Sequence, residues 1–225
     1  MRCKSALRAG SAVAALLACA AIAPATAGAA AVELNRACYL EGARVGVSAT
    51  GFAARSSISV RRNGSLIGTA TADDVGSVQA RFDAPDLPAG RREASYVLEL
   101  SDGATTASTR LPITRFHASF SPATGDPATM LVRFSVDGFG LLDAQPDVYL
   151  HYVAPDGSLR RTVQLGQARG VCGHLRTPTL RRLFPFRAQA GTWTLQFDTR
   201  RTYRRGRIDR PGFIFFTRRV KIVAS

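Results

Sequence analysis

The chain has 225 residues, of which 46% are hydrophobic and 20% charged, a composition that excludes a disordered or low-complexity protein. Lys and Arg number 30 against 16 Asp and Glu, so the formal net charge is +14. Beyond the first thirty residues no apolar stretch is long enough for a transmembrane helix, so we predict no membrane span in the mature chain.

The N-terminal segment has the layout of a secretory signal. Three basic residues come first, an apolar run covers 12–23, and small residues follow Pro24. We predict a signal peptide over 1–27, cleaved after Ala27, and a secreted or envelope-associated protein. In the alternative interpretation, "LLAC" is a lipoprotein box and Cys19 becomes a lipidated first residue.

The strands predicted in 28–114 follow from short alternating apolar runs that are separated by turn residues. Val45, Val47 and Ala49 fall on one face, and Asn63-Gly64 is suited to a type I′ hairpin turn. The predicted strand regions are 43–52, 57–70, 76–85, 94–103 and 108–114. Their number and spacing favour an immunoglobulin-like (Ig-like) sandwich.

A second sandwich is predicted over 115–225, where ten of the twelve Phe and the only Trp lie. Trp193 shares a strand face with Leu195 and Phe197, so we predict that it is a core residue. The predicted strand regions are 115–122, 130–139, 147–153, 159–166, 182–186, 191–198 and 212–223. The fold class is therefore all-β, with two consecutive Ig-like β-sandwich domains, 28–114 and 115–225.

The positive charge lies entirely in the second domain once the signal is removed. Residues 28–114 hold nine Arg and nine acidic residues, whereas 115–225 hold 18 basic residues against seven Asp. A GC-rich coding bias accounts for Arg in place of Lys, but not for this asymmetry. The imbalance indicates an anionic partner for the second domain.

Two stretches resemble known exported proteins. The run from "ATGFAARSSISV" to "FDAPDLPAG" resembles the Ig-like domains of actinobacterial exported proteins. "VYLHYVAPDG", "LGQARGVCGHL" and "GTWTLQFD" are similar to the second domain of uncharacterised actinobacterial secreted proteins. The resemblance implies an exported β-sandwich protein and carries no known activity, because a fold does not fix a function.

The mature chain keeps two cysteines, Cys38 and Cys172, in an oxidising compartment. An even number of cysteines there predicts one intramolecular disulfide that links the two domains. The alternative is two free or intermolecular thiols.

Cys172 also suggests an enzyme, which is the alternative function. Envelope L,D-transpeptidases combine Ig-like domains with a catalytic Cys in a Ser-His-Gly-Cys element, and His151 or His174 would be the base here. The residues before Cys172 are "ARGV", so the key motif is missing. G-x-S-x-G and paired metal-ligand spacings are also missing, so we predict no cofactor and no metal site.

The segment "RRTYRRGRIDRP" is predicted to be an exposed basic loop between two strands. Guanidinium groups bind phosphate and carboxylate well. Outside the cell these arginines would meet acidic wall polymers or anionic phospholipid headgroups, and we expect no nucleic acid. Extracellular nucleic-acid binding is a third possibility, which the charge and the aromatic residues favour but no recognisable motif supports. The alternative is an Arg-rich loop that is exposed to solvent and binds no specific partner.

The main prediction is a non-enzymatic exported binding protein of the cell envelope. Its anion-binding residues are Arg200, Arg201, Arg204, Arg205, Arg207 and Arg210.

Overall fold

The computed structural model describes residues 29–142, 145–206 and 213–223. All regular secondary structure in these residues is β, in sixteen strands that form several sheets. The prediction of an all-β, β-sandwich fold is confirmed. The predicted signal peptide 1–27, with Cys19, lies outside the described residues.

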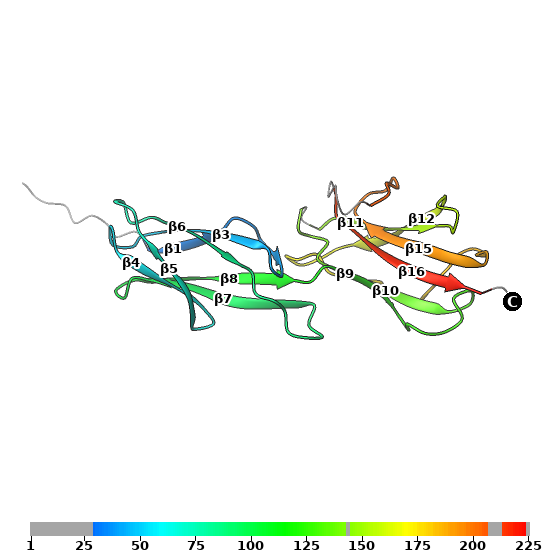
Figure 1. Ribbon diagram of the computed structural model, residues 1–225, viewed down its shortest axis with the longest axis horizontal. Coiled ribbons are helices and arrows are strands. Elements are labelled where there is room, and N and C mark those ends of the chain that lie inside the picture. Colours follow the sequence, from blue (N-terminus) through cyan, green and yellow to red (C-terminus); the bar gives the residue numbers. More distant parts are fainter. Residues whose placement is uncertain (1–28, 143–144, 207–212, 224–225) are drawn as a thin grey trace, which may run out of the picture.

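The N-terminal unit contains strands β1 to β8, arranged in two sheets (Figure 1). The smaller sheet has the order β1 (Ala31–Leu34), β3 (Arg44–Thr50), β6 (Val78–Asp83). The larger sheet has the order β2 (Tyr39–Leu40), β8 (Thr106–Thr114), β7 (Glu93–Ser101), β4 (Ser57–Arg62), β5 (Ser65–Thr71). Only β2 and β8 pair in parallel among these strands.

Local sequence explains these strands well. Val45, Val47 and Ala49 are all buried, as their alternation along β3 predicts. The hairpin β4–β5 closes where Arg62 pairs with Ser65. Between them Asn63 has φ 47° and Gly64 has φ 81°, the two positive angles that a type I′ turn needs.

The C-terminal unit contains strands β9 to β16, again in two sheets. In the first, β10 (Leu131–Asp137) pairs with β9 (His117–Ser121), β13 (Leu175–Arg176) and β14 (Arg181–Arg182). The second has the order β12 (Leu159–Gln167), β11 (Asp147–Val153), β15 (Gly191–Asp198), β16 (Phe215–Ile222).

Trp193 is a core residue, as predicted, with 2% of its surface exposed. Its ring packs 5.4 Å from those of Phe184 and Phe186, and its Nε1 donates to the carbonyl of Gln189 at 3.0 Å. The strand predicted over 182–186 was wrong beyond Arg182. Pro185 has no N–H for strand pairing, and its neighbours Phe184 and Phe186 pack into the aromatic cluster around Trp193 instead.

Each unit has its own hydrophobic core. One cluster of buried residues draws its members from between Ala30 and Ile113, and the other from between Phe116 and Ile222. The two units lie end to end along the long axis of the molecule (Figure 1).

The connection between the units is short and held on both sides. Only Arg115 and Phe116 separate β8 from β9. The Arg115 guanidinium donates to both carboxylate oxygens of Glu41, at 2.6 and 2.7 Å, and to the carbonyl of Leu87 at 3.2 Å. This bidentate pair ties the start of the C-terminal unit to the N-terminal unit.

Candidate functional site

Cys38 and Cys172 form the predicted disulfide between the two units. The S–S distance is 2.05 Å, the Cα atoms are 5.3 Å apart, and both residues are buried. The interpretation as two free thiols is therefore wrong for this structure. The transpeptidase-like alternative also loses its nucleophile, because Cys172 has no thiol to ionise.

His174, two residues beyond Cys172, has a partner of its own. Its Nδ1 lies 2.7 Å from Oδ1 of Asp137, which is largely buried. Glu93 of the N-terminal unit is close enough that burial, and then the charge of Asp137, raise the pKa of its carboxyl. His174 therefore acts in an electrostatic cluster at the junction of the units and not as a base for Cys172.

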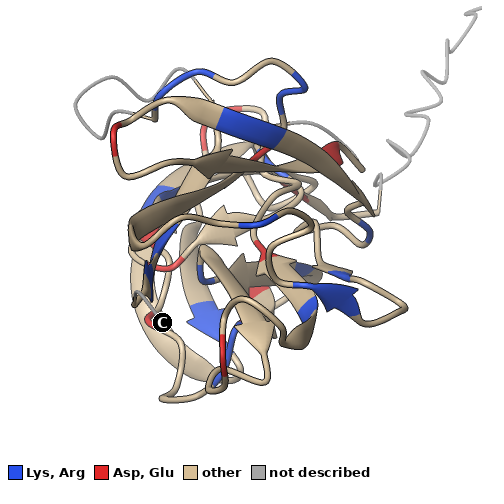
Figure 2. Cartoon of the chain, turned by 90° about the vertical axis from the view of Figure 1, so that its right-hand side faces the viewer, with Lys and Arg blue, Asp and Glu red and all other residues tan. Residues whose placement is uncertain are grey.

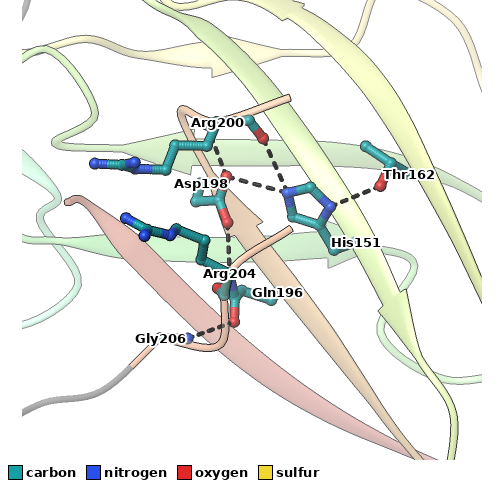
Figure 3. Close-up of polar contacts among 7 residues, drawn as sticks. All are labelled: His151, Thr162, Gln196, Asp198, Arg200, Arg204 and Gly206. Atoms are coloured by element: carbon teal, nitrogen blue, oxygen red, sulfur yellow. Dashed lines mark hydrogen bonds and ion pairs between the residues drawn. The ribbon is translucent and has the colours of Figure 1, made fainter. Parts of the chain in front are cut away.

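The other candidate base, His151, lies on the outer face of its sheet and is nevertheless fully buried. Its Nε2 is 3.1 Å from Oδ1 of Asp198 and 3.0 Å from the carbonyl oxygen of Arg200, and its Nδ1 is 2.8 Å from Oγ1 of Thr162 (Figure 3). Both neighbours of Nε2 are acceptors, so this nitrogen carries a proton and donates to them. The ring thus connects the strand pair β11–β12 to the segment after β15.

Gln196 and Asp198 extend this network along β15. Gln196 Nε2 donates to Oδ2 of Asp198 at 2.6 Å and to the carbonyl of Arg204 at 2.7 Å, and its Oε1 accepts from the backbone N–H of Gly206 at 3.0 Å (Figure 3). Asp198 Oδ1 also accepts from the backbone N–H of Arg200 at 2.8 Å. The backbone after β15 is therefore fixed at three points by side chains that are themselves buried.

The residues 199–206, which we call the basic loop, cover the outer face of the sheet. The ring of Tyr203 lies 5.4 Å from that of His151, and burial raises the pKa of its phenol. At Gly206 any side chain would collide with the ring of Phe215, so the close approach of loop and strand requires glycine there. This packing explains why His151, Gln196 and Asp198, on the outer face of the sheet, are inaccessible to water.

Four of the six predicted anion-binding residues lie in the basic loop. Arg201, Arg204 and Arg205 are exposed, and no carboxylate among the described residues is within ion-pair distance of them. Arg200 is half-buried, and its guanidinium lies 4.8 Å from the ring centre of Phe213. The other two, Arg207 and Arg210, lie outside the described residues.

The rest of the C-terminal unit adds further positive charge. Viewed from this end, Lys and Arg are spread over several of its strands and loops (Figure 2). Within the ranges that the structure describes, no group of three or more His, Cys, Asp or Glu could hold a metal ion. In the same ranges no helix is long and apolar enough to cross a membrane.

The supporting residues Thr162, Gln196 and Asp198 were missed in the sequence analysis. A signal for two of them exists. Gln196 and Asp198 alternate with Leu195 and Phe197, so they occupy the face opposite the core and directly precede an Arg-rich segment. Their burial required knowing that the loop folds back over its own strand.

Comparison of the chain with protein-family models found no match, and a search of curated proteins found no similar sequence.

Proposed function

We propose that the protein is an exported, non-enzymatic binding protein of the cell envelope, whose C-terminal unit contacts anionic envelope components through the basic loop. The observation that carries the proposal is the attachment of this loop at Arg200, Arg204 and Gly206 by the buried His151–Asp198–Gln196 network. A loop that is ordered before binding loses less conformational entropy when an anion binds.

The chemistry of the exposed side chains supports an anionic ligand. Arg201, Arg204 and Arg205 have no carboxylate partner among the described residues, so their guanidinium groups are available. Guanidinium groups bind phosphate and carboxylate oxygens with two parallel hydrogen bonds. Such groups occur in acidic wall polymers and in phospholipid headgroups.

Export and non-enzymatic action belong to the same proposal. A buried disulfide is typical of oxidising compartments and agrees with the predicted signal peptide 1–27. The bonding of Cys172 removes the candidate nucleophile. Each half of the chain resembles actinobacterial exported proteins in sequence. We therefore also propose that both units are Ig-like domains of an actinobacterial secreted protein.

The test is a binding assay on the mature chain, residues 28–225. The two probes are inorganic polyphosphate and vesicles of phosphatidylglycerol mixed with phosphatidylcholine. We expect R201S/R204S/R205S to bind at least one probe about tenfold more weakly than the wild type. The control R81S/R91S/R110S removes the same charge from exposed positions in the N-terminal unit and should change affinity by less than about twofold.

If R201S/R204S/R205S binds only polyphosphate more weakly, the loop is assigned to wall polymers. If it binds only the phosphatidylglycerol vesicles more weakly, the loop is assigned to phospholipid headgroups. The proposal would be overturned if the wild type bound neither probe, or if both triple variants weakened binding equally. The second result would mean that only net charge matters.

A further inference from the structure

Strand β12 forms one edge of its sheet, and two hollows lie along it. The first, of about 360 Å³, is lined by Tyr149, Thr162, Gln164 and Arg201. The second, of about 520 Å³, lies between β12 and β13, and among the residues that line it are Leu165, Leu175, Arg169, Arg176 and Arg181.

The two hollows share strand β12 and are linked by one hydrogen bond. Gln164 lines the first, and its backbone carbonyl accepts a hydrogen bond at 3.2 Å from Nη1 of Arg181, which lines the second. The stretch of β12 from Thr162 to Gln167 contributes to both, and at roughly 3.3 Å per residue it spans about 17 Å. We call the two hollows together the β12 track.

Among the described residues, every one of formal charge that lines the β12 track is an arginine. Arg169 and Arg176 are exposed and have no carboxylate within ion-pair distance among the described residues. His174 also lines the second hollow, but it is paired with Asp137. No Asp or Glu in the part of the chain that the structure describes lines either hollow.

The first hollow adds neutral donors to the guanidinium of Arg201. The hydroxyl of Tyr149 and the amide of Gln164 can donate to an anionic oxygen. Thr162 is held by His151, whose Nδ1 lies 2.8 Å from its Oγ1. Charged and neutral donors side by side can bind several oxygen atoms of one phosphate or carboxylate group.

We propose that the β12 track binds a linear polyanion in an extended conformation, with successive anionic groups at Arg201, Arg181, Arg176 and Arg169. This inference rests on the proposed function and specifies its ligand as a chain, not a membrane surface. The four arginines come from the basic loop, from the segment after β12 and from strands β13 and β14, and they line hollows on both sides of β12. A flexible chain can follow such a path, whereas a flat bilayer cannot contact both hollows at the same time. Each added contact raises affinity through effective concentration.

The test compares tripolyphosphate with long-chain polyphosphate, using the mature wild type and R169S/R176S. Arg181 is left in place because it bonds to the backbone of β12. We expect the wild type to bind the long chain at least about tenfold more tightly per phosphate than tripolyphosphate. R169S/R176S should lose most of that advantage, whereas its affinity for tripolyphosphate should fall much less, because the first hollow with Arg201 can still bind a short chain.

The matched control R91S/R110S removes two exposed charges from the N-terminal unit and should keep the length dependence. Equal affinity of the wild type for both lengths would overturn the β12 track. So would an unchanged length dependence in R169S/R176S. If R201S/R204S/R205S still weakened binding in that case, the proposed function would stand and only the extended track would fail. Binding to phosphatidylglycerol vesicles that polyphosphate does not displace would also contradict the track.

Discussion

At the scale of single residues, the buried network under the basic loop depends on Asp198. It is fully buried and accepts hydrogen bonds from His151, Gln196 and the backbone of Arg200. A carboxylate has acceptors on both oxygens, whereas an amide would turn an NH2 group toward one of these donors.

We therefore predict that D198N destabilises the protein by about 2–3 kcal/mol, because it leaves a buried donor without an acceptor. The measurement is the free energy of unfolding in denaturant. D147N, at an exposed position of the neighbouring strand β11, is the control and should change it by less than about 0.5 kcal/mol. If D198N unfolded like D147N, the network would not be holding the basic loop.

The pair of Glu41 and Arg115 makes stability depend on pH. The hydrogen bonds from Arg115 lower the pKa of the Glu41 carboxyl in the folded protein. A folded-state pKa below the unfolded one means that the stabilisation is complete above the ordinary pKa and is lost as pH falls through the lowered value.

We predict that E41Q is less stable than the wild type at neutral pH and that the two converge as pH falls below the ordinary pKa of a Glu carboxyl and through the lowered folded-state value. Unfolding free energies measured across this range provide the test. A difference that stays constant with pH would show that the charge of Glu41 contributes nothing.

At the scale of elements, two loops of the C-terminal unit lock together beside the disulfide. The backbone N–H groups of Phe139 and Gly140 donate to the carbonyls of Gly173 and Cys172, both at 3.1 Å. Gly173 has φ 74°, and a side chain there would collide with the backbone of Gly140.

Gly173→Ala is expected to cost more than about 2 kcal/mol, because a positive φ and a backbone collision act together. Gly170→Ala is the matched control, since Gly170 has the same φ of 74° and open space around its Cα, and it should cost only about 1 kcal/mol. Equal losses in thermal unfolding would mean that the loop contact is not tight.

Elements whose shape depends on local sequence could be predicted, and those fixed by distant contacts could not. The turn at Asn63-Gly64 needs only its own two residues. The path of the basic loop depends instead on His151, far away in the chain. Alternation along β15 placed Trp193 in the core correctly, but burial of its opposite face by a returning loop leaves no periodic signal.

At the scale of the whole molecule, the disulfide and the Arg115–Glu41 pair are both contacts between the two units. The disulfide could be predicted, because two cysteines in an oxidising compartment leave one pairing. The ion pair could not, since it depends on how the units meet. Two attachments beside a connection of two residues restrict hinge motion.

The double variant C38S/C172S should therefore be less stable by as much as about 5 kcal/mol, because the bridge joins residues 134 positions apart. Denaturant unfolding measures the loss, and small-angle scattering should show a wider range of shapes. The reduced wild type serves as the control and should match the variant. Unchanged stability and shape would mean that the disulfide does not couple the units.

We propose that arginines on a fixed loop, and not net charge alone, bind an anionic envelope component. The most direct measurement is polyphosphate affinity as a function of salt for the wild type, R201S/R204S/R205S and R81S/R91S/R110S. We predict that affinity falls with rising salt in the wild type and the control, and that the loop variant is both weaker and less salt-sensitive. Identical salt curves for the two triple variants would contradict the account.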